Sequence, residues 1–251
     1  MGLFYNKSKV FYVISLIQYM KLHKLSKNVY AITGLTHPIG VNVGFVINKR
    51  EVIVIDASWT VSDAKKIIRT IKKITNKPIR WLINTEYHSD HVFGNIIFKE
   101  HNVKIISHEN TTKVLKKLSN YPSKMKKISP NINFGDVKVI LPDLTFKRKK
   151  HLNGVKMFYS PGHTNTNIVV FLPKERILFA SDSLYPGRNP TVKFGNKKLW
   201  KEWLKSLEKM EILNPKLIVP GHGKIIGGDN IKKEFKRHKE FLMSLIKSTP
   251  Y

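Results

Sequence analysis

Apolar residues recur along this chain with two kinds of spacing, one typical of strands and one typical of helices. Together they predict two halves, each of which contains strands followed by helices. In the first half, apolar and β-branched stretches typical of strands cover 28–33, 41–48, 51–56, 79–83 and 103–107. Helical spacing of apolar residues predicts helices over 62–74, 94–99 and 109–118. Residues 119–136 are rich in Pro, Ser, Asn and Lys, and are predicted to form a loop between the halves.

The second half repeats the pattern. It predicts strands over 137–141, 155–159, 168–172, 177–180 and 217–219, and helices over 198–213 and 231–246. Strands that alternate with helices are typical of α/β proteins. We therefore predict two sheets packed face to face with helices outside, in one domain over 28–251 that follows an N-terminal extension over 1–27.

The absence of cysteine restricts the chemistry of this chain. A length of 251 residues is enough for one substantial domain with a hydrophobic core. Without Cys, disulfides and thiolate metal sites are excluded, so any metal site must be built from His, Asp and Glu.

The formal net charge of +28 favours a polyanionic partner or an anionic substrate. The Lys residues are spread over the whole chain in short pairs such as Lys72-Lys73, with little of the aromatic interleaving that stacks bases. A compositional bias of the genome would have the same effect. We expect a small anionic substrate, and nucleic acid is not the expected primary partner. The oligomeric state is left open.

The N-terminus has some features of a secretory signal. Lys7 and Lys9 precede an apolar stretch over 10–20, but Gln18 interrupts it and no small-x-small cleavage site follows. The stretch is too short to span a bilayer, and Met20 is an alternative start. We expect a cytoplasmic protein without a transmembrane segment, with secretion as the alternative.

The segment Asn84–His91 holds four metal-competent side chains directly after the apolar strand over 79–83. Alternate residues of an extended segment share a face, so Glu86 and His88 can reach one point. A tight turn would direct Asp90 and His91 to a second point nearby. Carboxylate and imidazole both suit zinc and similar divalent ions, and two adjacent ions would make a hydrolytic nucleophile from water. The alternative is a solvated loop that happens to be rich in His and Glu.

Three further sites follow predicted strands, namely His163 after Pro161-Gly162, Asp182 after 177–180, and His222 after Pro220-Gly221. The C-terminal ends of strands are where α/β proteins usually place their chemistry. We expect each Pro-Gly to permit a tight turn that directs the imidazole outward. A single His in this position is more often structural, but seven potential ligands at four such sites are hard to explain in that way.

These residues resemble the signature of the metallo-β-lactamase superfamily, which is His-x-His-x-Asp-His followed by separate His, Asp or Cys, and His ligands. The resemblance covers about residues 28–246. It implies a four-layer αββα sandwich with a dinuclear metal site, most often zinc, at one edge of the two sheets.

By that pattern, the first metal site takes Glu86, His88 and His163, and the second takes Asp90, His91 and His222. Asp182 bridges the two metals. A hydroxide between the metals would be the nucleophile, and Asp90 would orient it as well as bind metal.

Glu86 departs from the signature, which has His at this position. A carboxylate binds zinc at distances similar to those of imidazole, so the site is not lost. The added negative charge weakens the metal as a Lewis acid and shifts preference toward manganese or iron. We expect two bound metals, and the alternative is a weakened first site with one tightly held metal.

Within the superfamily, residues 53–118 look most like the secreted β-lactamase branch, with Asp56-Ala57-Ser58-Trp59-Thr60 among the similar segments. That branch has Cys in place of Asp182 and Lys three residues later, where this chain has Tyr185. Asp182 is more similar to glyoxalase II enzymes, but those add a helical domain after the last ligand, and only residues 223–251 follow here.

We therefore predict a metal-dependent hydrolase that cleaves an acyl bond in a thioester, lactone, lactam or related ester. Candidate substrate-binding residues are Tyr185, Arg188 and Asn189, with the segment His37–Gly40 as a second part of the rim. Arg188 is the candidate anchor for a carboxylate.

Three other functions stay open. They are a β-lactamase proper, a nuclease or phosphodiesterase with the same metal centre, and a non-catalytic protein in which Glu86 has disabled the chemistry. Nucleases of the superfamily generally keep His at the first position and carry RNA-binding segments, which we do not find in this sequence.

Overall fold

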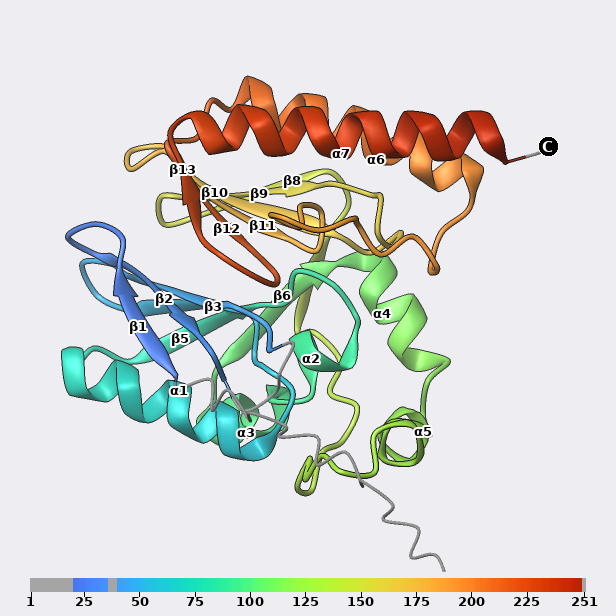
Figure 1. Ribbon diagram of the computed structural model, residues 1–251. Helices are drawn as coiled ribbons and strands as arrows, with labels where there is room; N and C mark the ends of the chain where they lie inside the picture. Colours follow the sequence, from blue (N-terminus) through green and yellow to red (C-terminus); the bar gives the residue numbers. More distant parts are fainter. Residues whose placement is uncertain (1–19, 36–39, 250–251) are drawn as a thin grey trace, which may run out of the picture.

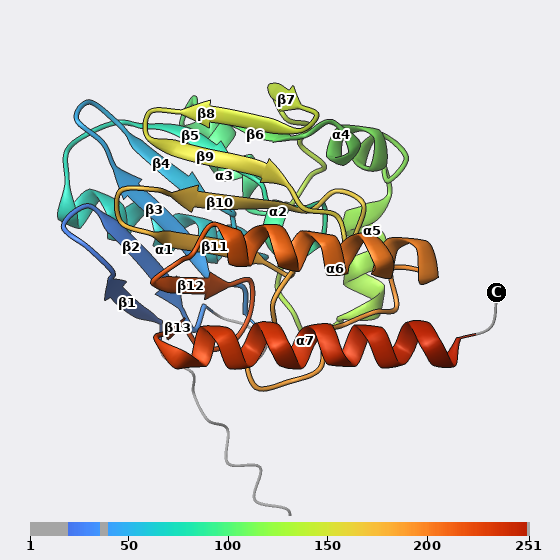
Figure 2. The same ribbon diagram turned by 90° about the horizontal axis from the view of Figure 1, so that it is seen from above.

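The structure is a computed structural model that describes residues 20–35 and 40–249. Its strands form two sheets that face each other between layers of helices (Figure 1), and Figure 2 shows the same layers from above. The predicted α/β arrangement of two packed sheets with outer helices is therefore confirmed.

The first sheet has seven strands in sequence order, antiparallel from β1 to β4 and parallel from β4 to β7. These strands are β1 (Lys21–Lys24), β2 (Val29–Thr33), β3 (Val43–Ile47), β4 (Val52–Ile55), β5 (Ile79–Ile83), β6 (Lys104–His108) and β7 (Leu144–Phe146).

The second sheet has six strands in the order β13-β12-β11-β10-β9-β8, with β11 and β12 as its parallel pair. These strands are β8 (Lys149–Leu152), β9 (Val155–Tyr159), β10 (Ile168–Leu172), β11 (Ile177–Ser181), β12 (Leu217–Pro220) and β13 (Ile226–Gly227). Parallel neighbours end at the same edge of a sheet, so the residues that follow β4 and β5, and those that follow β11 and β12, are brought together.

Helices cover the outer face of each sheet (Figure 1). Those of the first half are α1 (Val61–Ile74), α2 (Ser89–Val92), α3 (Asn95–Glu100), α4 (Glu109–Lys116) and α5 (Tyr121–Ile128). Those of the second half are α6 (Lys197–Ile212) and α7 (Asp229–Ser248). No helix among residues 20–35 and 40–249 is long and apolar enough to cross a membrane.

The strand alternation divides the core into layers. On β4, Val52 and Val54 pack toward α1 and α3, whereas Ile53 and Ile55 pack against the second sheet. A strand buried on both faces is a continuous apolar run, as this one is. On the far side, α6 and α7 bury residues such as Trp203 against the outer face of the second sheet. The helix α1 begins at Val61, one residue before the predicted start, because the Thr60 side chain caps it and accepts a hydrogen bond from the Asp63 backbone N–H at 3.0 Å.

Several parts of the chain differ from the sequence prediction, and the strands β8 and β13 were not predicted. Residues 137–141 form no strand; Pro142 interrupts the run, and the strand that pairs with β6 is β7, three residues later. The predicted loop over 119–136 contains α5, which has Pro122 in its first turn. The fold also begins before residue 28, because β1 pairs with β2. The signal-like stretch over 1–19 lies outside the described residues.

Candidate metal centre

The seven candidate ligands converge at one edge of the sandwich because each follows a strand that ends there. Glu86 and His88 come from the exit of β5, and Asp90 and His91 belong to the short helix α2. His163, Asp182 and His222 follow β9, β11 and β12 of the second sheet. The sheets are joined at this edge, since the Ile168 N–H donates to the Thr85 carbonyl at 2.8 Å and the Asn42 N–H donates to the Gly221 carbonyl at 2.7 Å.

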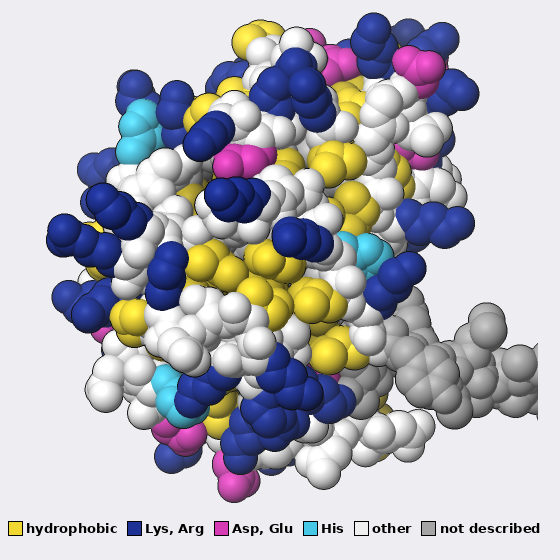
Figure 3. All heavy atoms as spheres, turned by 90° about the vertical axis from the view of Figure 1, so that its left-hand side faces the viewer, with side chains coloured by type: hydrophobic (Ala, Val, Ile, Leu, Met, Phe, Trp, Pro, Cys, Tyr) yellow, Lys and Arg dark blue, Asp and Glu magenta, His cyan; other side chains and the backbone are white. Residues whose placement is uncertain are grey.

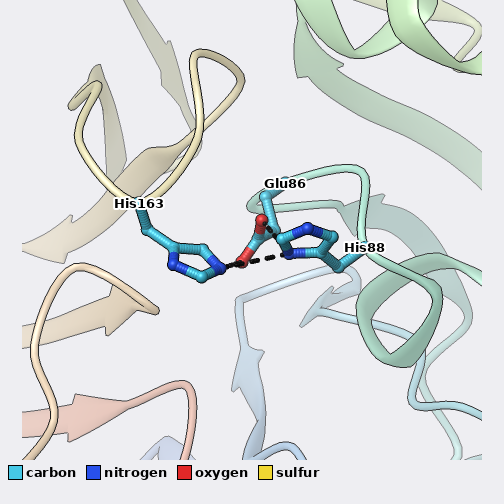
Figure 4. A group of neighbouring side chains, drawn as sticks. All are labelled: Glu86, His88 and His163. Carbon is cyan, nitrogen blue, oxygen red and sulfur yellow. Dashed lines mark hydrogen bonds and ion pairs between the residues drawn. The ribbon is translucent and has the colours of Figure 1, made fainter. Parts of the chain in front are cut away.

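The first group consists of Glu86, His88 and His163, which point toward one another in Figure 4. Glu86 Oε2 lies 2.8 Å from His88 Nδ1, and His88 Nδ1 lies 3.2 Å from His163 Nε2. Glu86 Oε1 lies 3.9 Å from His163 Nε2. The three side chains are buried.

The second group consists of Asp90, His91 and His222. Asp90 Oδ2 lies 3.0 Å from His222 Nε2 and 3.8 Å from His91 Nε2. Asp90 is the more exposed member, with 19% of its side chain accessible, whereas His91 is fully buried. A partly accessible carboxylate beside a buried imidazole suits a position where substrate and water enter.

Asp182 lies between the two groups. Its Oδ2 is 3.6 Å from His163 Nε2 in the first group and 3.5 Å from His222 Nε2 in the second. Its Oδ1 is 3.6 Å from His91 Nε2. The Asp182 carboxylate is thus within reach of both groups, and the bridging role that the family resemblance implies for it stays a prediction.

The donor set fits divalent metal ions. Glu86 Oε1, His91 Nε2 and Asp182 Oδ1 are buried and have no hydrogen-bond partner among the described residues. Buried polar atoms are almost always satisfied, so such a cluster needs an explanation. Two ligand atoms of a tetrahedral zinc ion with bonds of about 2.0–2.1 Å lie about 3.3 Å apart. The separations of 3.4 to 3.6 Å from His91 Nε2 to the Glu86 and Asp182 oxygens are close to that value and too long for good hydrogen bonds.

The outer nitrogens of three imidazoles are held by acceptors, which leaves the inner nitrogens free to bind metal. His91 Nδ1 donates to Asp56 Oδ2 at 3.0 Å. His163 Nδ1 donates to the Thr191 carbonyl at 2.8 Å, and His222 Nδ1 donates to the Gly40 carbonyl at 3.3 Å. Partners of this kind fix the tautomer of a metal-binding His.

The carboxylates and imidazoles of the site shift one another's pKa values. Burial raises the pKa of Glu86, but the positive charges of His88, His163 and His91 outweigh burial and hold the pKa below its usual value. Burial lowers the pKa of His222, but Asp182 and Asp90 outweigh it and raise that pKa to about 10. Without metal, Asp182 and Asp90 therefore favour the protonated form of His222, and a metal ion can replace this positive charge.

Sequence reasoning identified the candidate ligands but missed the residues that support them. Asp56 accepts hydrogen bonds from the Thr85 N–H and hydroxyl at 2.8 and 2.7 Å, in addition to the one from His91. The Thr85 hydroxyl also lies 2.7 Å from Ser181 Oγ. Asp56 and Ser181 both have positive φ angles, of 64° and 50°. Asp56 follows β4, so the rule that located the ligands at strand ends would have found it too.

In the pairs Pro161-Gly162 and Pro220-Gly221, glycine is required by close packing and not by an unusual backbone conformation. Neither Gly162 nor Gly221 has a positive φ angle. A Cβ atom on Gly162 would collide with the Trp203 ring, and one on Gly221 would collide with Asp182 Oδ1. The small residue before each His is thus required by its neighbours, and in the case of Gly221 the neighbour is a candidate ligand.

The predicted substrate-binding residues separate into three kinds. The Tyr185 side chain is buried and not at an exposed rim, and its hydroxyl lies 2.8 Å from Asp182 Oδ2 and 3.3 Å from His163 Nδ1. Arg188 is exposed and lines a cavity of about 550 Å³ beside His222. Asn189 does not line this cavity, and its Oδ1 lies 3.4 Å from Arg237 Nη1. Residues 37–39 of the predicted rim lie outside the described residues.

Comparisons with known proteins agree with this geometry. The family model described as the metallo-beta-lactamase superfamily matches residues 37–222. Metallo-beta-lactamase type 2 from Bacillus sp. (strain 170) is 29% identical over 215 residues, covering 82% of this chain and 77% of that protein. Metallo-beta-lactamase type 2 from Pseudomonas aeruginosa is 26% identical over 212 residues, covering 81% of this chain and 78% of that protein.

Solved structures share the fold. The crystal structure of DIM-1 metallo-beta-lactamase superposes with a TM-score of 0.72 at 20% identity, covering 90% of this chain and 98% of that one. Because the family match spans most of the chain and includes every candidate ligand, this protein belongs to the metallo-beta-lactamase superfamily of metallo-hydrolases.

Proposed function

We propose that this protein is a dinuclear metal hydrolase that cleaves an acyl bond in a small anionic substrate. The observation that carries the proposal is the convergence of Glu86, His88 and His163 with Asp90, His91 and His222 around Asp182. Bound in this cluster, two divalent ions would lower the pKa of water and polarise the carbonyl of the substrate.

The residues of the chain have separate tasks in this proposal. The imidazoles present neutral Nε2 or Nδ1 atoms, and the carboxylates balance the charge of the ions. Asp90 is the partly exposed carboxylate at the entrance, and its Oδ2 already accepts from His222 at 3.0 Å. In this proposal Asp90 orients a water molecule or accepts a proton from it.

Two cavities flank the site and suggest the shape of the substrate. The one beside His222 is lined by Arg188 and Lys224, which would attract an anionic group. The other, of about 630 Å³, is lined by Tyr87, Thr164 and Phe194 beside the first group. The Phe194 ring is 44% exposed and lies 4.3 Å from the His88 ring, centroid to centroid. We propose that the acidic end of the substrate lies beside Arg188 and an apolar part beside Phe194.

The spread of Lys and Arg over the whole sequence supports a small substrate over nucleic acid. On the one face that Figure 3 shows, Lys and Arg side chains lie among neutral and hydrophobic ones, with a larger group in the lower part of the view. Nucleic-acid binding needs a row of cations spaced along a phosphate backbone. The β-lactamases among the relatives make a β-lactam the first substrate to test within the acyl class.

A substrate panel tests the proposal. Protein purified without chelator is assayed with β-lactams, lactones, thioesters and phosphodiesters, with zinc, manganese and iron supplied in turn. We expect hydrolysis of at least one acyl substrate, and His88→Ala and Asp182→Ala should lose metal and activity together. Hydrolysis of phosphodiesters alone, or fewer than about 0.5 metal ions per chain, would count against the proposal.

A further inference from the structure

Glu86 lies at the centre of the cluster and not at the edge of one metal group. Its Oε2 is 2.8 Å from His88 Nδ1 in the first group, and its Oε1 is 3.4 Å from His91 Nε2 in the second. Glu86 also forms a set of three with His91 and Asp182, in which one ligand atom from each lies within 4.8 Å of the others. The same carboxylate is thus within reach of metal-binding atoms on both sides.

The two oxygens of Glu86 have different surroundings. Thr164 Oγ1 is 3.5 Å from Oε2, but this hydroxyl donates to Asn167 Oδ1 at 2.7 Å, so it is a weak partner for Glu86 at best. Oε1 is buried and has no hydrogen-bond partner among the described residues. Leaving an ionised carboxylate oxygen buried without a partner costs free energy, which a cation at that oxygen would recover.

The residue type at position 86 matters because imidazole and carboxylate differ in the number of ligand atoms that they can present to the site. An imidazole at this position presents one nitrogen toward the site, so it serves one metal. A carboxylate has two oxygens on one carbon and can bind two cations at once, one through each. In this chain, Glu86 Oε2 lies beside His88 of the first group (Figure 4). Glu86 Oε1 lies 3.4 Å from His91 Nε2 of the second group and 3.9 Å from His163 Nε2 of the first.

We infer that Glu86 is a ligand shared by both metal sites, a second carboxylate bridge beside Asp182. The inference rests on the proposed dinuclear function. It predicts that loss of Glu86 weakens metal binding on both sides of the cluster, whereas loss of a ligand that belongs to one group weakens one side.

Zinc affinity in two single-site backgrounds tests this inference. His88→Ala disables the first group and His222→Ala disables the second, and Glu86→Gln is added to each. Zinc affinity is measured by competition with a chromophoric chelator, and circular dichroism checks that each variant is folded. We expect Glu86→Gln to weaken the remaining zinc site at least about tenfold in both backgrounds. Asp90→Asn is the matched control, and it should weaken zinc binding in the His88→Ala background alone.

Loss confined to the His222→Ala background would overturn the shared role and assign Glu86 to the first group, while the dinuclear site would stand. Wild-type protein that binds no zinc would instead remove the proposed function itself. If the single-site variants do not hold zinc, Glu86→His in the intact site decides. The shared role predicts that one zinc ion is kept and the other binds at least about tenfold more weakly. Two zinc ions bound as tightly as in the wild type would overturn it.

Discussion

The Tyr185 hydroxyl donates a 2.8 Å hydrogen bond to Oδ2 of Asp182, the carboxylate that lies between the two metal groups. Burial, followed by the charge of Asp182, raises the pKa of Tyr185 well above its usual value, so the hydroxyl keeps its proton and acts as the donor. The Tyr185 backbone N–H donates to His238 Nε2 at 2.8 Å, which ties this support to α7. By the resemblance, the secreted β-lactamase branch has a substrate-binding Lys at this position, whereas Tyr185 of this chain contacts a candidate ligand.

Removing the hydroxyl should therefore affect metal binding first. In Tyr185→Phe, Asp182 loses its donor while the packing of the ring is kept, and we expect zinc affinity to fall about tenfold. The free energy of unfolding of the metal-free protein should fall by about 1–2 kcal/mol. Chelator competition and urea denaturation measure the two effects. Tyr30→Phe, in the core away from the site, is the control. Unchanged zinc affinity would show that the hydrogen bond does not hold Asp182 in place.

Asp56 should act on the metal through His91. The Asp56 carboxylate accepts from His91 Nδ1 at 3.0 Å and so directs Nε2 into the cluster. Asp56→Asn keeps the shape but loses the negative charge, and we expect zinc affinity to fall about 10- to 100-fold. The exposed Asp136→Asn is the control. A change of less than about threefold in Asp56→Asn would exclude this supporting role.

Gly221 should be intolerant of a single added carbon. A Cβ at this position collides with Asp182 Oδ1 and with the Ser181 backbone. We expect Gly221→Ala to weaken zinc binding and to lower the free energy of unfolding by about 1–3 kcal/mol. Gly227→Ala is the matched control, because its Cβ would lie 2.9 Å from Leu217 Cδ2, a side-chain methyl group that can move, and 3.2 Å from the Lys216 carbonyl oxygen, and it meets no candidate ligand. Equal effects of the two substitutions on zinc binding would contradict the explanation.

The positions of the candidate ligands could be predicted from the sequence because they depend on a local rule. Each of these residues follows an apolar strand, and strand ends on one edge of a layered sheet come together. The same rule marks Asp56, which follows β4, but it does not predict the partner of Asp56. Asp56 and His91 lie in different elements, and the parallel pairing of β4 with β5 makes them neighbours. Tyr185 follows a strand too, but the direction of its side chain depends on packing against α7.

The errors in the predicted fold also have physical reasons. The strands β1 and β8 have the sequences KLHK and KKHL and lie at sheet edges, so they lack the apolar alternation that marks a buried strand. The run over 137–141 is apolar because Val137 and Val139 pack in the small cluster around α5, not because it pairs with a strand. Periodicity reports burial, and it does not tell whether the backbone of a buried segment belongs to a sheet.

His238 should make stability depend on pH. Burial lowers the pKa of His238 to about 4, and the neutral ring both donates from Nδ1 to the Glu234 carbonyl and accepts at Nε2 from Tyr185. The unfolded chain binds the proton with a pKa near 6.5. Between these values the unfolded state holds more protons, so this contribution is complete above about pH 6.5 and is lost as the pH falls to about 4.

We expect His238 to account for a loss on the order of 2–3 kcal/mol in unfolding free energy across that range. The measurement is urea denaturation of wild type and His238→Gln between about pH 4 and 7. The non-titrating variant should be less stable near pH 7 and lose less on acidification. Titration of the metal-binding imidazoles is common to both proteins, so the difference between the curves isolates His238. Parallel curves would contradict the assignment.

A substitution of Arg188 tests the proposal that the substrate has an anionic end. The loop that carries it is held by α7, because Arg237 Nη2 donates to the carbonyls of Tyr185 and Arg188 at 2.5 and 2.6 Å. The guanidinium therefore projects from a fixed backbone, over the Tyr185 ring at 5.1 Å and into the cavity beside His222. It touches no candidate ligand in the described structure, so it should act on substrate binding and not on the chemical step.

We expect Arg188→Ala to raise KM for an anionic acyl substrate about tenfold with little change in kcat, since a contact made equally in ground and transition states alters binding alone. The effect should shrink as salt is raised, because the cavity is open to solvent. An uncharged ester of the same substrate should show no difference between variant and wild type. Arg69→Ala, on the exposed face of α1, controls for the loss of one positive charge. A fall in kcat for both substrates, with KM unchanged, would mean that Arg188 supports the metal centre and does not bind the anion.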